Sequence, residues 1–222
     1  MSGSREIKNL LYDQVARSGK AVSSPKRLEL LEILCQGEKS VEQLALDSHI
    51  SLKLASAHLK ELKSARLVVT RREGKNIYYR LVDSHVATLW VELRSLAEER
   101  LLELQSAMQA LVSRPDELAP ITGSELLAQA KRGDIVVIDV RPASEFMQAH
   151  LPYARSMPVT ELRKRMNEIP RDKSVVAYCR GPFCLMAKEA VELLSKEGVC
   201  ARRIELGVAE WHAQGLPLVR EF

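Results

Sequence analysis

The fold of the second half of the chain is decided by the stretch Val175-Val176-Ala177-Tyr178-Cys179-Arg180-Gly181-Pro182-Phe183-Cys184-Leu185. Its apolar start predicts a buried strand, its Gly-Pro pair predicts a loop, and a helical pattern follows from Leu185 to Glu197. Cys179 therefore ends a strand and faces the N-terminus of a helix. Unpaired backbone N–H groups and the helix dipole lower the pKa of a thiol placed there from about 8.5 toward neutrality. This context predicts a nucleophilic thiolate, and a buried structural cysteine is the alternative.

Strands and helices alternate on both sides of this stretch. Thr122 to Lys131 predicts a capped helix, Ile135 to Ile138 a strand, and Ala201 to Ile204 another strand before a short helix around Trp211. This alternation predicts a parallel sheet of α/β type, with its site at the carboxyl ends of the strands. Cys179 follows such an end.

The first half of the chain reads as helices and a hairpin. Helical spacing of apolar residues predicts helices over Ser4 to Ser18, from Ser24-Pro25 to near Gly37, from Ser40, and from Ser51 through Leu62. The last two, joined by the turn Asp47-Ser48-His49, form a helix-turn-helix unit. Strand-like runs at 67–72 and 76–81 around Glu73-Gly74-Lys75 predict a β-hairpin, the wing.

A long helical pattern then runs from about Ser84 to Val112. Its apolar stripe consists of Val86, Leu89, Leu93 and Leu96 and then, shifted by one position, of Leu101, Leu104, Met108 and Leu111. So long a stripe predicts packing against a second copy of the chain, and a helix packed only on its own domain is the alternative. The run Ser113-Arg114-Pro115-Asp116-Glu117 breaks the pattern and predicts a linker.

Charge is concentrated in one region of an otherwise balanced chain. The net charge is +4, yet eight basic and two acidic residues lie between Ile50 and Arg80. Such a patch is typical of a nucleic-acid contact, and a solvated face is the alternative. No apolar run approaches the ~18 residues of a membrane span, and four cysteines in a chain of this size do not suggest a disulfide framework. We therefore expect a cytoplasmic protein without membrane contact.

The basic region has the motifs of a known family. The run Ile50-Ser51-Leu52-Lys53-Leu54-Ala55-Ser56-Ala57-His58-Leu59-Lys60-Glu61-Leu62 and the hairpin Arg71-Arg72-Glu73-Gly74-Lys75-Asn76-Ile77-Tyr78-Tyr79-Arg80-Leu81 resemble the arsenical-resistance-repressor (ArsR) family of winged-helix regulators. The resemblance covers about residues 4 to 112 and implies a homodimeric repressor that places one helix in the major groove of double-stranded operator DNA. By position, the implied DNA-facing residues are Lys53, Leu54, Ser56, Ala57 and Lys60 of that helix and Arg72 and Lys75 of the wing.

Metal sensing is the best-known use of that family, and this sequence departs from it. The helix Val41 to Asp47 lacks the cysteine pair of metal-sensing members, and Leu96 and Glu99 stand where histidine partners of His85 are expected. We therefore expect no metal and no cofactor. Some sulfur-responsive members carry a cysteine near the place of Cys35, which makes Cys35 a candidate redox residue, with a packed small hydrophobe as the alternative.

From about Ile121 to Val219 the chain resembles a rhodanese, a sulfurtransferase domain. The matching segments are Asp139-Val140-Arg141-Pro142, Glu145-Phe146, His150-Leu151-Pro152-Tyr153-Ala154, Tyr178-Cys179-Arg180-Gly181 and Gly207-Val208 with Trp211. In that family the cysteine takes a sulfane sulfur, becomes a persulfide and passes the sulfur to an acceptor thiol. The resemblance implies that Cys179 reacts and that Asp139, Arg141 and His150 hold the scaffold. Leu185 replaces the arginine of related phosphatases, so phosphoryl chemistry is not expected.

These observations predict two domains: a winged helix-turn-helix DNA-binding and dimerisation domain at 1–112 and a rhodanese-like α/β domain at 121–222, joined by a linker at 113–120. We expect a DNA-binding transcriptional repressor whose rhodanese-like domain senses or transfers reactive sulfur, with a small sulfane-sulfur donor or an acceptor thiol as partner. The alternative is a thiosulfate or polysulfide sulfurtransferase that acts through Cys179 and uses its helical half for protein contacts.

Within the loop, the candidate catalytic residues are Cys179, Arg180 and Cys184. Cys184 follows Cys179 closely enough to attack a persulfide there and form a disulfide, as resolving cysteines do. The alternative is that Cys184 is simply a small residue at the start of a helix.

Overall fold

The computed structural model describes residues 2–112 and 117–220. It divides into two compact units, Met1–Trp90 and Val91–Phe222. This boundary lies N-terminal to the linker expected at 113–120 and falls inside a helix, and residues 113–116 of that linker lie outside the described residues. The expected fold class, a winged helix-turn-helix followed by an α/β parallel-sheet domain, is confirmed.

The first unit contains the helix-turn-helix and the wing. Its elements are α1 (Ser2–Val22), α2 (Pro25–Leu34), β1 (Lys39–Ser40), α3 (Val41–Asp47), α4 (Leu52–Ser64), β2 (Val68–Glu73), β3 (Asn76–Leu81) and the beginning of α5 (Ser84–Arg100). The side chain of Ser40 accepts a hydrogen bond from the Gln43 N–H, and that of Ser51 accepts one from the Leu54 N–H. These two caps begin α3 and α4 where the sequence predicted them.

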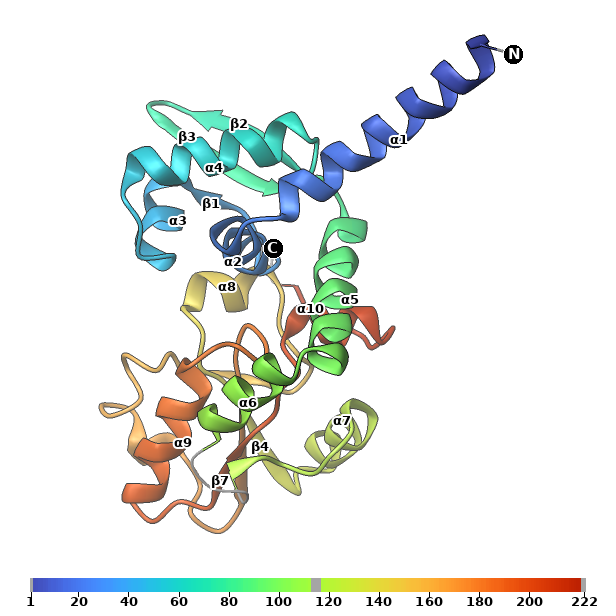
Figure 1. Cartoon of the computed structure of the whole chain (residues 1–222). Coiled ribbons are helices and arrows are strands. Elements are labelled where there is room, and N and C mark those ends of the chain that lie inside the picture. The colour runs from blue at the N-terminus through green and yellow to red at the C-terminus, as the bar shows by residue number, and fades with distance from the viewer. Residues whose placement is uncertain (1, 113–116, 221–222) are drawn as a thin grey trace. The chain divides into compact units, whose positions relative to one another are not determined.

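The wing is an antiparallel hairpin at the side of α4. The three strands of this sheet have the order β1-β3-β2 (Figure 1). Glu73 pairs with Asn76, so Gly74 and Lys75 make the turn, and Gly74 adopts a φ of 59° that glycine tolerates best. The sequence did not predict β1, because two residues are too few to show an alternating pattern.

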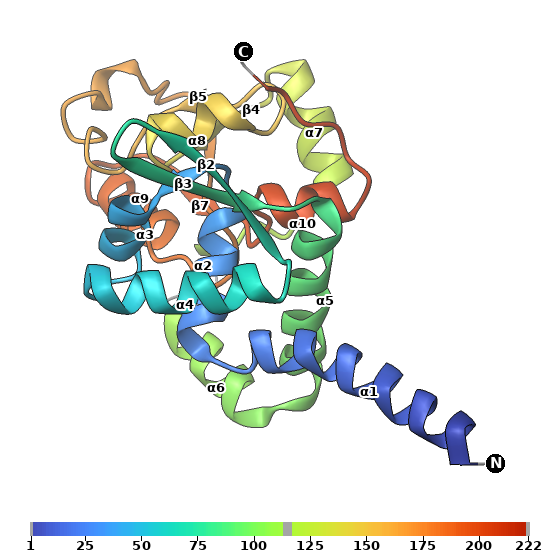
Figure 2. The same ribbon diagram turned by 90° about the horizontal axis from the view of Figure 1, so that it is seen from above.

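The core of the first unit lies between α2, α3, α4 and the hairpin. Leu30, Leu44, Leu59 and Leu62 are completely buried there. In contrast, α1 projects away from the other helices of its unit in both views (Figure 1, Figure 2). Ile7, Leu10, Leu11 and Val15 of α1 are therefore exposed, whereas Ala21 near its C-terminal end is buried in the core of the unit.

The prediction of a single helix from Ser84 to Val112 is wrong, because the structure has two helices there. Helix α5 ends at Arg100, and α6 (Leu102–Leu111) follows after Leu101, whose φ of −106° and ψ of 106° are extended. The break lies where the apolar stripe shifts by one position. A straight helix would place the two parts of that stripe on different faces, whereas two helices orient each part separately.

The second unit is a parallel sheet with helices on both faces. After α6 come α7 (Gly123–Arg132), β4 (Ile135–Asp139), α8 (Ala143–Gln148), β5 (Arg155–Ser156), η2 (Met166–Glu168), β6 (Ser174–Tyr178), α9 (Met186–Lys196), β7 (Ala201–Arg203) and α10 (Val208–Ala213). The strand order is β5-β4-β6-β7, and each pair of neighbours is parallel. Ala190 and Leu194 of α9 pack on one face, and Leu126 of α7 and Trp211 of α10 on the other. Strands β4 and β6 end side by side at Asp139 and Tyr178.

Among the described residues, no helix is long and apolar enough to cross a membrane.

Candidate active site and nucleic-acid interface

The loop between β6 and α9 contains a disulfide. Cys179, directly after β6, is joined to Cys184, just before α9, and their Cα atoms lie 6.3 Å apart. Cys179 is 2% exposed and Cys184 is half-buried. The backbone N–H of Cys184 donates to the carbonyl of Gly181 at 3.1 Å, which turns the chain back toward Cys179. The structure thus brings together the two cysteines that the sequence singled out, at the carboxyl edge of a parallel sheet.

Arg180 is held by a buried carboxylate. Its Nη2 lies 2.6 Å from Oε1 of Glu145 on α8, and its Nε lies 3.1 Å from Oε2. The Glu145 side chain is 1% exposed and that of Arg180 is 12% exposed. Removing such a carboxylate from water is costly unless a cation pairs with it. The ion pair with Glu145 therefore connects Arg180 of the cysteine loop to helix α8.

A buried polar network holds the ends of β4 and β6. Arg141 donates to Asp139 from its backbone N–H and its guanidinium, and both side chains are completely buried. The hydroxyl of Tyr178 donates to Asp139 and accepts from the Leu151 N–H at 3.1 Å. Burial, with the negative charge of Asp139, raises the pKa of Tyr178 well above its ordinary value. Asp139 and Arg141 thus have the scaffold role that the sequence implied.

His150, the third residue that the resemblance assigns to the scaffold, contacts Phe146 of α8. It is 5% exposed, its Nδ1 lies 2.9 Å from the Phe146 carbonyl oxygen, and its ring stacks on that of Phe146 at 3.7 Å between centroids.

The residues implied in DNA contact lie on the outer side of α4 and on the wing. Lys53, Leu54, Ala57 and Lys60 are exposed, and Ser56 is half-buried. The other face of α4 carries the buried Ala55, Leu59 and Leu62. In the wing Arg72 and Lys75 are exposed. The structure thus leaves these side chains accessible, apart from Ser56.

Arg71 of the wing is engaged within its own unit. Its guanidinium lies 2.7 Å from Glu38 and 2.6 Å from Glu73, and it stacks over the ring of Tyr78. Hydrogen bonds to these two carboxylates raise the pKa of Arg71. Arg72 and Lys75 carry no such acidic partner in the described chain, which leaves their charges for an external anion.

Cys35 caps the C-terminus of α2 and is half-buried. Within residues 2–112 and 117–220, no group of three or more His, Cys, Asp or Glu side chains could hold a metal ion.

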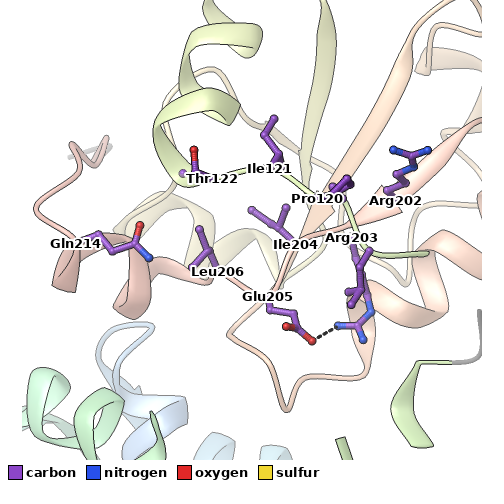
Figure 3. Close-up of a pocket in the computed structure, with 12 residues that line it drawn as sticks. Pro120, Ile121, Thr122, Arg202, Arg203, Ile204, Glu205, Leu206 and Gln214 are labelled. Atoms are coloured by element: carbon purple, nitrogen blue, oxygen red, sulfur yellow. Dashed lines mark ion pairs between the residues drawn. The ribbon is translucent and has the colours of Figure 1, made fainter. Parts of the chain in front are cut away.

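A hollow of about 720 Å³ lies at the edge strand β7 (Figure 3). Its lining includes Pro120, Ile121, Ile204 and Leu206. Arg203, 3% exposed, also lines it and lies 3.8 Å from Glu205. The described lining does not include the Cys179 loop, so the hollow is separate from the disulfide.

The second unit also contains a buried ion pair that was not predicted from the sequence. Arg94 of α5 and Glu210 of α10 are each 5% exposed, and Arg94 Nη1 lies 2.6 Å from Glu210 Oε1. The sequence does contain a feature that could have identified Arg94 as buried. Arg94 follows Val86 and Trp90 at helical spacing, and a charged residue in such a series predicts a buried partner.

Comparisons with known proteins cover both units. The family model described as "Bacterial regulatory protein, arsR family" matches residues 24–70, and the one described as "Rhodanese-like domain" matches residues 122–214. An HTH-type transcriptional regulator of Mycobacterium tuberculosis is 39% identical over 218 residues, which are 98% of this chain and 96% of that protein.

Two further relatives each match one half of the chain. A sulfurtransferase of Allochromatium vinosum is 35% identical over 100 residues, which are 43% of this chain and 91% of that protein. The solution structure of a homodimeric winged helix-turn-helix DNA-binding domain from Mycobacterium bovis is 45% identical, with a TM-score of 0.41, and covers 43% of this chain and 89% of that one.

Proposed function

Because the chain belongs to the ArsR family of bacterial transcriptional regulators and carries a C-terminal rhodanese-like domain, we propose that it is a repressor whose binding to operator DNA is controlled by sulfane sulfur at Cys179. The observation that carries the proposal is the disulfide between Cys179 and Cys184. The disulfide shows that the loop can bring the two sulfur atoms within bonding distance, which a resolving cysteine needs in order to attack its partner.

The proposed reaction has two steps. The Cys179 thiolate attacks the outer sulfur of thiosulfate, forming a Cys179 persulfide and releasing sulfite; a polysulfide donor releases a shorter polysulfide instead. The Cys184 thiolate then attacks the Cys179 sulfur and expels hydrosulfide. The two thiolates are oxidised to the disulfide, and the transferred sulfur receives their two electrons. A dithiol reductant afterwards returns the disulfide to two thiols.

The DNA-binding part of the proposal rests on α4 and the wing. The exposed Lys53 and Lys60 of α4 and Arg72 and Lys75 of the wing supply positive charge for phosphate contacts. Leu54 and Ala57 are exposed apolar side chains on the same helix, and they suit the methyl groups of thymine. We place α4 in the major groove on these grounds.

A second copy of the chain is the partner that we propose for α1. Ile7, Leu10, Leu11 and Val15 are 57–71% exposed and follow helical spacing, so they form one apolar stripe. A stripe of this kind is normally covered in solution. A homodimer would cover it and would present two copies of α4 to an operator with two half-sites.

The alternative function is a sulfurtransferase that turns over, and the similarity to the Allochromatium vinosum sulfurtransferase favours it. The two functions differ in the fate of the persulfide sulfur. An enzyme delivers it repeatedly to an added acceptor thiol, whereas a sensor expels it once as hydrosulfide and remains a disulfide.

A gel-shift titration of the reduced full-length protein on the promoter DNA beside its own gene tests the proposal. Polysulfide should release the wild type from DNA and should not release Cys179→Ser. Cys184→Ser should trap the persulfide, seen in the intact mass as the gain of one sulfur atom. Cys200→Ser, at an exposed cysteine outside the loop, is the matched control and should respond like the wild type. If Cys179→Ser leaves DNA as the wild type does, sensing lies elsewhere, and Cys35 is the first candidate.

A further inference from the structure

Arg94 is a buried cation of the second unit with two acidic partners. Its Nη1 lies 2.6 Å from Glu210 Oε1, and its Nε lies 2.8 Å from Glu98 Oε1 one turn along α5. The side chains of Arg94 and Glu210 are 4% and 6% exposed. Separating two such buried charges would leave each one unpaired and poorly solvated, which is costly in free energy. The two side chains therefore stay paired in one position.

Glu210 connects Arg94 to the backbone of the cysteine loop. Its second oxygen, Oε2, accepts a hydrogen bond of 2.8 Å from the N–H of Gly207. A β-carbon at Gly207 would lie 2.3 Å from the Arg180 carbonyl oxygen and 2.9 Å from that of Cys179. The carboxylate of Glu210 thus binds Gly207, the residue whose Cα closely approaches the backbone of the cysteine loop.

The same ion pair touches the loop directly at two points. A β-carbon at Gly181 would lie 3.2 and 3.3 Å from the oxygens of Glu210 and 3.5 Å from Nη1 of Arg94. Further along the loop, the guanidinium carbon of Arg94 lies 5.8 Å from the ring centre of Phe183, a cation–π distance. Gly181 and Phe183 both lie between the two bonded cysteines, so Arg94 and Glu210 contact the segment that the disulfide closes.

Helix α5 carries Arg94 and runs without a break from Ser84 to Arg100. Val86, about two turns before Arg94, is buried in the core of the winged-helix unit. A helix with intact hydrogen bonds moves as a rigid element. A shift of the Arg94 side chain therefore acts on the helix that begins in the DNA-binding unit.

We propose that Arg94 is a positioning residue that couples the oxidation state of the Cys179–Cys184 pair to helix α5. The inference rests on the proposed function of the loop as a sulfur sensor. The contacts described above belong to the disulfide state. Reduction opens the ring that contains Gly181 and Phe183 and so alters the surface that Arg94 and Glu210 meet. Since coupling between two sites is reciprocal, operator DNA also shifts the thiol–disulfide equilibrium of the loop.

The test compares the full-length wild type with the double variant Arg94→Gln/Glu210→Gln and with Arg94→Lys. The double variant removes both charges of the more buried pair, so Glu210 is not left as a carboxylate without Arg94, whereas the remaining partner Glu98 is 24% exposed. The amide oxygen introduced by Glu210→Gln can still accept from the Gly207 N–H. For each protein, operator affinity is measured in the dithiol and the disulfide state, and intact mass confirms the state. In the wild type the two affinities should differ about tenfold. The double variant should lose most of that ratio, and Arg94→Lys should retain part of it.

Two failures are distinguishable. A wild type with equal affinity in both states contradicts the proposed function itself. A double variant that forms the disulfide and keeps the wild-type ratio overturns the role of Arg94 and leaves the proposed function standing. If circular dichroism shows that the double variant does not fold, Phe183→Leu takes its place, because it removes the ring beside Arg94 from a half-buried position. An unchanged ratio in Phe183→Leu then overturns the inference.

Discussion

Gly207 lies so close to Arg180 that a β-carbon at residue 207 would come within 2.3 Å of the Arg180 carbonyl oxygen. Gly207 directly precedes α10, so this close approach brings the backbone of the cysteine loop against the start of that helix. Only glycine lets two backbones approach in this way. We therefore expect the position of the Cys179 loop to depend on Gly207, a residue that carries no functional group.

Gly207→Ala should consequently displace the loop. The methyl group meets backbone atoms, which cannot rotate away, so we expect a loss of stability of about 1–3 kcal/mol and slower alkylation of Cys179 in the reduced protein. Urea denaturation and the rate of iodoacetamide labelling measure the two effects. Gly19→Ala is the control, because nothing lies within 4 Å of that position in α1. Wild-type labelling in Gly207→Ala would show that the loop tolerates the displacement.

Arg180→Gln should destabilise the second unit without abolishing sulfur uptake. The substitution leaves Glu145, 1% exposed, without this cation, and breaking a buried pair costs about 3 kcal/mol. Intact mass after polysulfide treatment should still show reaction at Cys179, since Arg180 faces α8. The double variant Arg180→Gln/Glu145→Gln should recover part of the stability. Complete loss of sulfur uptake in a folded Arg180→Gln would instead make Arg180 a catalytic residue.

Lys53→Ala and Arg72→Ala should each weaken operator binding. Each lost phosphate contact should also reduce the slope of log affinity against log salt by about 0.9. Fluorescence anisotropy over a salt series measures both quantities. Lys196→Ala, an exposed lysine at the end of α9, should change neither. If the first two variants bind as the wild type does, the orientation assigned to α4 and the wing is wrong.

Leu11→Glu should prevent dimerisation, because it places a charge in the middle of the apolar stripe of α1, where Leu11 is 62% exposed. Light scattering after gel filtration should give the mass of one chain for this variant and of two for the wild type. Asn9→Glu adds the same charge on the opposite side of α1 and should leave the dimer intact. A dimeric Leu11→Glu would remove α1 from the proposed interface.

The elements that could be predicted from the sequence are those whose signals are local. The side chains of the capping residues accept hydrogen bonds from N–H groups three residues further on, and the Gly74 turn joins two strands that are neighbours in the chain. The capping residues are Ser40, Ser51 and Thr122. The cysteine loop was predictable for the same reason: strand, Gly-Pro turn and helix follow one another without interruption. Each of these depends on hydrogen bonds and backbone preferences that span only a few residues.

Which charged side chains pair over long sequence distances depends on the folded chain. Glu145 and Arg180 pair across 35 positions, and Arg94 and Glu210 across 116. No spacing rule predicts such a pair, because burial selects the partner only after the sheet and its helices have packed. The break at Leu101 could be predicted only in part. The sequence shows the shift of the apolar stripe, but whether the helix bends or breaks there depends on what each half packs against. The strand–loop–helix setting of Cys179 was thus local in origin, whereas the contact of its loop with Arg94 of α5 exists only in the folded chain.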